Sequence, residues 1–261
     1  MLAGQRDGED ALAQHVGATC KAVVEIAGTP MLARVLESLG SSPNLRKIIV
    51  SGPGSEKLAG QELINDLMQA GSVSWQPARA SPSLSAYDVL CQLPPNEQVL
   101  LTTADHALLS PKIINEFCTQ SAEQAADLTV GLAPYALVRD KFPEMKKTVL
   151  RFRDTELCGC NLFAFLTPAG REAANLWRQV ESQRKNPLRV IRFLGWGAVV
   201  RYLLGMLTLD EALNTLSRNL GLRVCAIILP YADAAVDVDS VSDYRLVQAT
   251  FQTRTKNAAI R

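Results

Sequence analysis

The sequence lacks any apolar run of the roughly 18–20 residues that a membrane-spanning helix needs. It also lacks a basic start followed by an apolar stretch, so no secretion signal is predicted. A net charge of +1 over 261 residues gives no electrostatic reason to expect nucleic acid or a membrane surface as the main partner. No Gly-x-Gly-x-x-Gly follows an expected strand, which argues against a Rossmann dehydrogenase. The apolar and charged fractions, 48% and 20%, are those of an ordinary soluble globular protein.

The six cysteines lack the spacing of a metal or redox site. Only Cys158 and Cys160 are close together, and one residue separates them instead of the two residues of zinc and redox pairs. We therefore expect reduced, mostly buried thiols and a cytoplasmic protein.

Strands and helices are expected to alternate along the chain. Apolar strands are predicted at 47–52, 73–75, 98–103, 126–132, 149–152, 160–165 and 224–229, and helices at 30–39, 56–70, 81–93, 111–118 and 244–251. This spacing is typical of βαβ units, so we predict a single α/β domain over 1–261 with a Rossmann-like, mostly parallel sheet flanked by helices. Ligands of such sheets bind beyond the carboxyl ends of the strands.

Residues 167–221 have a different pattern and are predicted to form a helical insertion or subdomain. Helices are expected at 168–181, 188–204 and 208–220, and the last begins with a capping box from Thr208 to Glu211. The polar residues 253–261 are expected to be a frayed tail.

The N-terminal block combines a small-residue turn with two cations. In Leu2-Ala3-Gly4, Gly4 can adopt a positive φ and bring backbone N–H groups close to a ligand. Successive amides in such a turn form a concave anion site, to which Arg6 and Lys21 add positive charge. The alternative is a surface loop with two ordinary cations.

Acidic residues follow two of the expected strands. Asp105 comes after strand 98–103, where a carboxylate can hold Mg²⁺ through its hard oxygens or cap the next helix. Asp237 and Asp239 follow strand 224–229 and are expected to alternate on a strand with their side chains on one side. The alternative is two solvated acids before a helix.

The N-terminal block resembles the signature of the MobA-like and sugar-phosphate nucleotidyltransferases. The matching residues are Leu2, Ala3, Gly4, Arg6, Lys21, Gly28, Pro30, Met31 and Leu32. The Asp105 strand and the segment 237–244 resemble two further family segments, in the family's order. The strand that precedes Leu-Ala-Gly in this family is absent here. Either the sequence as given is truncated, or its start codon is placed too late, or another segment replaces the strand.

The resemblance implies a role for each matching residue. Asp105 binds Mg²⁺, and the segment 237–244 supplies the second metal ligand, for which we favour Asp239 and keep Asp237 in reserve. The residues at which this family recognises the base are Arg79, Ser81 and Ser85, or else these serines only begin a helix. Gly159 and Asn161 match the family's Gly-x-Asn on the acceptor side.

The implied activity is Mg²⁺-dependent transfer of a nucleoside monophosphate from a triphosphate to a phosphorylated small-molecule acceptor, a sugar phosphate or a cofactor precursor. Pyrophosphate is released. The amides of Leu2, Ala3 and Gly4, with Arg6, would hold the leaving phosphates, and Lys21 would neutralise charge at the α-phosphate. A homodimer is left open.

Two other functions stay open. A glycosyltransferase of related fold uses an Asp-x-Asp motif, which Asp237-Val238-Asp239 is. A catalytically idle nucleotide-binding module would suit the acidic stretch 7–10 that follows the turn.

Overall fold

The computed structural model describes residues 1–4, 10–58, 62–69, 71, 73–182 and 195–259. Its strands are β1 (Glu25–Ile26), β2 (Thr29–Pro30), β3 (Ile48–Gly52), β4 (Val73–Pro77), β5 (Val99–Leu101), β6 (Leu128–Pro134), β7 (Leu150–Arg151), β8 (Glu156–Phe165) and β9 (Val224–Ile228). Its helices are α1 (Ala11–Val16), α2 (Met31–Gly40), α3 (Glu62–Gln69), α4 (Pro82–Gln92), α5 (Pro111–Glu123), α6 (Tyr135–Lys141), α7 (Pro168–Ser182), α9 (Trp196–Leu203), α10 (Leu209–Leu220) and α11 (Val241–Ala259). Short 3₁₀ turns lie at Lys21–Val23, Ser55–Leu58 and Ala232–Ala235.

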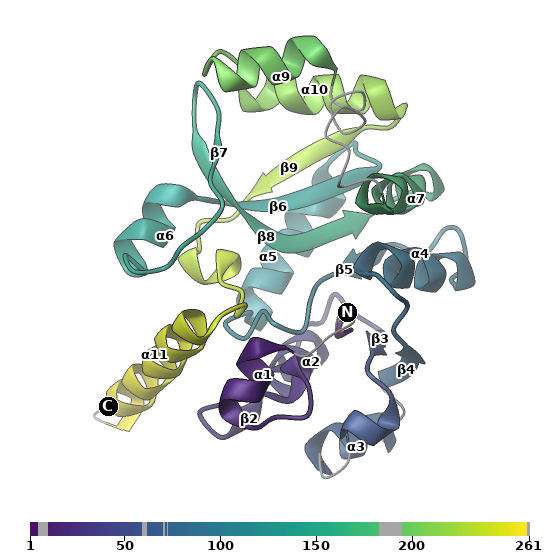
Figure 1. Ribbon diagram of the computed structural model, residues 1–261. Helices are drawn as coiled ribbons and strands as arrows, with labels where there is room; N and C mark the ends of the chain where they lie inside the picture. Colours follow the sequence, from purple (N-terminus) through teal and green to yellow (C-terminus); the bar gives the residue numbers. More distant parts are fainter. Residues whose placement is uncertain (5–9, 59–61, 70, 72, 183–194, 260–261) are drawn as a thin grey trace.

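The three residues Met1–Ala3 join two groups of strands into one sheet (Figure 1). β3 and β4 are parallel, and the other group has the order β5-β8-β6-β9. Leu2 forms parallel bridges to Ser51 in β3 and to Thr103 just after β5. The backbone N–H of Leu2 donates to Thr102 at 2.8 Å, and that of Ala3 donates to Ser51 at 2.7 Å. This segment therefore holds the central position of the sheet, where no strand was predicted.

The mixed α/β fold with a parallel-rich sheet is confirmed, with one reversed strand that was not foreseen. β6 and β9 are parallel, whereas β8 is antiparallel to both β5 and β6. The register between β6 and β8 shifts between Val130 and Leu132, so β8 bulges there. Asn161 lies in this bulge with a φ of +49°.

Apolar residues fill both faces of the sheet. Along β8, Leu162 belongs to the large cluster that also includes Phe117 of α5, while the neighbouring Phe163 and Phe165 face a smaller cluster that includes Ala174 of α7. Successive side chains of a strand point to opposite faces. Helices α2 and α5 therefore pack on one side, and α4, α7 and α10 on the other (Figure 1).

Most expected helices are present, but the prediction for the C-terminal residues was wrong and two further helices were not predicted. The capping box of α10 forms, because Thr208 Oγ1 accepts from Glu211 N at 3.2 Å and the Glu211 carboxylate accepts from Thr208 N at 2.9 Å. The prediction of a frayed tail from residue 253 was wrong as far as Ala259, since α11 continues through these polar residues. Within this part of the helix, Arg254 pairs with Asp233 at 3.0 Å. Helices α1 and α6 were not foreseen.

Residues 167–221 contain α7, α9 and α10, as expected for a helical segment, and part of the predicted helix 188–204 lies outside the described residues. In the part of the chain that the structure describes, we find no helix with the length and apolar character to cross a bilayer.

Candidate active site

A cavity of about 780 Å³ extends along β5, β6 and β8 and reaches the residues that follow the carboxyl end of β5. Its polar end includes Lys21, Asp105, Asn161 and Asp239, which come from four separate parts of the chain. Its apolar wall is formed by side chains of β5, β6, β8 and α7, namely Leu101, Leu128, Val130, Phe163, Phe165, Ala173, Ala174 and Trp177. One cavity therefore joins a charged end to an apolar surface, as is common in small-molecule sites.

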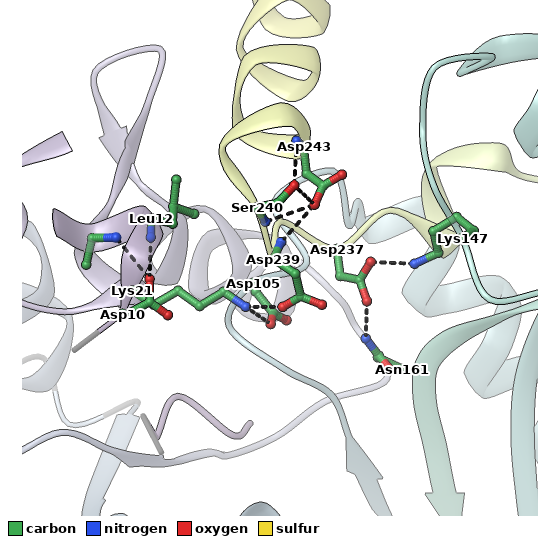
Figure 2. Close-up of polar contacts among 11 residues, drawn as sticks. Asp10, Leu12, Lys21, Asp105, Lys147, Asn161, Asp237, Asp239, Ser240 and Asp243 are labelled. Carbon is green, nitrogen blue, oxygen red and sulfur yellow. Dashed lines mark hydrogen bonds and ion pairs between the residues drawn. The ribbon is translucent and has the colours of Figure 1, made fainter. Parts of the chain in front are cut away.

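Lys21 brings two distant carboxylates together (Figure 2). Its Nζ donates to Asp105 Oδ2 at 2.7 Å and also to Asp239 Oδ1. The side chains of Lys21 and Asp105 are 20% and 22% exposed, while Asp239 is mostly exposed. The backbone is set by Val238, which is fully buried and donates its N–H to the carbonyl oxygen of Asp105 at 3.0 Å.

Lys21 and Asp105 each favour the charged form of the other. Burial disfavours the ionised form of Asp105, but the adjacent Lys21 ammonium outweighs it and holds the pKa of the carboxyl below its usual value. Burial likewise disfavours the charged form of Lys21, yet Asp105 and Asp239 raise its pKa above the usual value. The lysine and the two carboxylates together leave one net negative charge facing the cavity.

A divalent cation fits this donor set. Asp105 Oδ1 is buried and makes no hydrogen bond of ordinary geometry among the described residues, although the Thr103 hydroxyl helps to lower the pKa of this carboxyl. The described residues contain no group of three or more His, Cys, Asp or Glu side chains that would form a closed metal site. Mg²⁺ does not need one, because it commonly binds one or two carboxylates together with waters and substrate phosphates. Asp105 and Asp239 supply such oxygens.

Asp237 points to a different lysine (Figure 2). Its Oδ1 pairs with Lys147 Nζ, and its Oδ2 accepts from Asn161 Nδ2 at 3.2 Å. The expectation that Asp237 and Asp239 alternate on a strand was wrong, because they lie in an irregular stretch between the 3₁₀ turn at Ala232–Ala235 and α11. The two side chains consequently serve separate clusters.

The N-terminal turn differs from the predicted anion site in two respects. The amides of Leu2 and Ala3 are already used in the sheet, so they are not available to phosphates. Gly4 has no positive φ; a Cβ there would lie 2.7 Å from the Cβ of Ala78, so glycine is needed for this close approach. All three residues line the cavity. Arg6 lies outside the described residues.

The residues expected to recognise the base make hydrogen bonds at the start of α4. Ser81 Oγ caps the helix by accepting from Leu84 N at 3.3 Å, and Ser85 Oγ accepts from Arg79 N at 2.8 Å. The guanidinium of Arg79 pairs with Asp88 at 2.9 Å. These three residues do not line the cavity, and their role in base recognition stays a prediction.

On the acceptor side, Asn161 lines the cavity whereas Gly159 pairs with Leu132 inside the sheet. Lys147 was missed by sequence reasoning, because it lies in an irregular segment between α6 and β7 and matches no motif. His106, next to Asp105, is buried and its Nε2 lies 3.4 Å from the carbonyl oxygen of Asp233, so it packs in the core. Arg201 pairs with Glu211 at 2.7 Å.

The model of the MobA-like NTP transferase domain matches residues 12–144, a little over half of the chain. The chain belongs to this family. As a MobA-like NTP transferase it is a nucleotidyltransferase, and the family uses a nucleoside triphosphate together with a small-molecule acceptor. No curated protein matches the sequence.

Solved structures resemble the whole chain. A hypothetical transferase from Thermus thermophilus is 28% identical, with a TM-score of 0.77, and the match covers 93% of this chain and 98% of that one. A CMP:2-keto-3-deoxy-manno-octonic acid synthetase complexed with CTP is 12% identical, with a TM-score of 0.61, and 97% and 98% of the two chains are covered. A 4-diphosphocytidyl-2C-methyl-D-erythritol synthase is 14% identical, with a TM-score of 0.55 and 89% and 94% covered. The last two show that the fold is shared.

Proposed function

We propose that this protein transfers a nucleoside monophosphate from a nucleoside triphosphate to a phosphorylated small molecule, and that it does so with Mg²⁺. The observation that carries the proposal is the convergence of Asp105 and Asp239 on Lys21 at the polar end of the cavity. In the reaction an oxygen of the acceptor phosphate attacks the α-phosphorus, the bond from the α-phosphorus to the bridging oxygen breaks, and pyrophosphate leaves with that bonding pair.

Asp105 and Asp239 would hold the magnesium ion. Asp105 has the unpartnered Oδ1, and Asp239 is the more exposed of the two and can turn toward a ligand. When bound, Mg²⁺ supplies charge neutralisation to the triphosphate. The net negative charge of the cluster favours a divalent cation there, which supports Asp239 over Asp237 as the second ligand.

Lys21 would stabilise charge on the α-phosphate. An ammonium group has three donors, and two of them are engaged by Asp105 and Asp239. The third is left for a phosphate oxygen, and the two carboxylates fix the direction of the group before substrate arrives. Positioned charge of this kind lowers the barrier most where charge develops. The Gly4 amide, which makes no sheet hydrogen bond among the described residues, remains a candidate donor to the leaving phosphates.

The apolar wall of the cavity supports a small-molecule acceptor, since side chains such as Leu128, Val130 and Phe163 offer no groups that would bind a nucleic-acid backbone. All six cysteines are free. Burial raises the pKa of Cys118 to about 11 and that of Cys160 to about 12, so both thiols stay protonated and inert. These features fit a protein of the reducing cytoplasm.

The test is pyrophosphate release with each of the four common triphosphates and a panel of sugar phosphates and other phosphorylated acceptors. Activity that requires both substrates and Mg²⁺ is the expected result. Asp140→Ala, which alters an exposed ion pair on α6 outside the cavity, is the matched control and should retain full activity. Release of a nucleoside diphosphate from a nucleotide sugar would instead favour a glycosyltransferase, and nucleotide binding without either product would favour an idle module.

A further inference from the structure

Lys147, Asp237 and Asn161 form a chain of contacts that ends at the cavity. The Lys147 ammonium pairs with Asp237 Oδ1, and the two side chains are only 11% and 21% exposed. Asp237 Oδ2 accepts from Asn161 Nδ2 at 3.2 Å. Of the three residues only Asn161 lines the cavity, and Figure 2 shows Asp237 lying between the other two. The first two residues therefore reach the cavity through the third.

These contacts fix which end of the Asn161 amide faces Asp237. An ionised carboxylate has no proton and can only accept hydrogen bonds, so it requires the NH₂ end of the amide. The reversed amide would set its oxygen against a carboxylate oxygen and lose the hydrogen bond. Oδ1 of Asn161 is thus directed away from Asp237, and the described residues give it no hydrogen bond.

The backbone at Asn161 is strained in a way that supports a functional role. Its φ of +49° lies in the left-handed region, which costs energy for a residue with a Cβ, although asparagine tolerates it better than most. The residue lies where the register between β6 and β8 shifts. Bulges of this kind re-aim a side chain and are frequent beside active sites.

We infer that Lys147 and Asp237 are positioning residues that hold Oδ1 of Asn161 toward the acceptor, and that the acceptor presents a hydroxyl group to it. An acceptor-only oxygen at this place favours an O–H donor and disfavours a phosphate oxygen. The phosphate that attacks therefore lies elsewhere in the cavity, and the acceptor belongs to the class of hydroxylated phosphates. The identity of the substrate in this inference rests on the proposed function. The positioning of Asn161 by Lys147 and Asp237 does not.

The assignment also separates Asp237 from the metal site. Both of its carboxylate oxygens have partners, and the ion pair with Lys147 balances its charge. Asp105, by contrast, keeps an unpartnered buried oxygen.

The first experiment needs no turnover. The side-chain amide of Asn161 is followed by NMR in the wild type, in Asp237→Asn and in Lys147→Met. We expect both substitutions to shift the Asn161 Nδ2 resonances, while Asp233→Asn, which removes a comparable lysine–aspartate pair with Lys141, leaves them unchanged. Glycerol and inorganic phosphate are then added separately as probes. Glycerol should shift the Asn161 Cγ resonance in the wild type and not in Asp237→Asn. An equal response to phosphate, or unchanged resonances in both variants, would overturn the inference.

The second experiment measures kinetics with an acceptor that supports turnover. Asp237→Asn should raise the KM for the acceptor by about tenfold, the cost of about one lost hydrogen bond, with the KM for the triphosphate and kcat close to wild type. The exchanged variant Asn161→Asp/Asp237→Asn restores an oxygen that faces the cavity and should recover most of the acceptor affinity. A purely structural role would give no such recovery. If no acceptor supports turnover, the proposed function fails while the NMR result still decides the positioning role.

Discussion

Two lysine–aspartate clusters, one lining the cavity and one behind Asn161, differ in how completely their polar groups are hydrogen-bonded. Around Lys21, two carboxylates share one ammonium, and a buried oxygen of Asp105 has no partner among the described residues. Around Lys147, one carboxylate balances one ammonium, and both oxygens of Asp237 are engaged. Excess charge and an unmet hydrogen bond indicate a site that binds a ligand, whereas a satisfied pair indicates a support that orients a neighbour.

The largest expected effect is the loss of the unpartnered carboxylate. Asp105→Ala should lower kcat/KM by about a thousandfold or more, because it removes a proposed metal ligand and one of the groups that orient Lys21. Pyrophosphate release measures the effect. Near-UV circular dichroism should show an intact fold, since Lys21 keeps its second partner Asp239. Turnover close to wild type would show that the two clusters have been assigned the wrong roles.

Lys21→Ala should have the next largest effect and should reveal itself in kcat. The ammonium is proposed to stabilise charge that develops in the transition state, so kcat should fall by about a hundredfold with a smaller change in the affinity for triphosphate. Steady-state kinetics and nucleotide titration together separate the two terms. A rise in KM with an unchanged kcat would reduce Lys21 to a binding group. Lys141→Ala, in an ion pair outside the cavity, is the matched control.

Comparing Asp239→Asn with Asp237→Asn tests the two clusters directly. The first should raise the Mg²⁺ concentration for half-maximal activity at least about tenfold. This is the lower limit of the loss in affinity that is usual when a residue supporting a metal site is replaced. The second should leave the Mg²⁺ dependence unchanged and alter only the acceptor KM. Titrating Mg²⁺ into both variants at fixed substrate concentrations gives the answer, and the opposite pattern would exchange their roles.

The smallest expected effect concerns His106, which is buried close to both clusters. Burial lowers its pKa below the usual 6.5; Asp105 and Asp237 oppose the shift, and Lys147 adds to it. Below pH 6.5 the unfolded chain takes up a proton that the folded protein resists. The free energy of unfolding should therefore decrease as pH falls below 6.5, by at most about 1.4 kcal/mol per pH unit.

Denaturant unfolding between pH 8 and about pH 5, where few carboxylates yet titrate, measures this slope. The Met1 amino group adds a slope of the same sign in this window, because burial lowers its pKa to about 5. His106→Gln should flatten it, whereas His15→Gln, at the other and exposed histidine, should leave it unchanged. A slope below pH 6.5 that is the same in His106→Gln as in the wild type would place its cause elsewhere.

Sequence patterns predicted those parts of the site that lie in local motifs. Lys21, Asp105 and Asp239 could each be singled out because a turn, a strand end or a helix start surrounds them. Lys147 could not, because its partner Asp237 is 90 residues away and nothing nearby distinguishes it from other surface lysines. The availability of the Leu2 and Ala3 amides could not be judged either, since their use in the sheet depends on two distant strands.

The fold could likewise be predicted where local patterns determine it, and the prediction failed where distant parts of the chain determine it. Periodicity indicates a strand without its direction, so the reversal of β8 was out of reach. The extension of α11 through polar residues depends on tertiary contacts such as the pairing of Arg254 with Asp233. Local propensity describes such a segment as a tail, and the packing of the whole chain makes it a helix.

The most direct test of the central claim is a crystal structure of the protein with Mg²⁺ and a non-hydrolysable triphosphate. We predict one ion coordinated by both Asp105 and Asp239 at about 2.0–2.1 Å, with Lys21 Nζ on an oxygen of the α-phosphate. Asp237 should remain with Lys147 and Asn161. An ion bound through Asp237, or a triphosphate bound without contact to Lys21, would contradict the account.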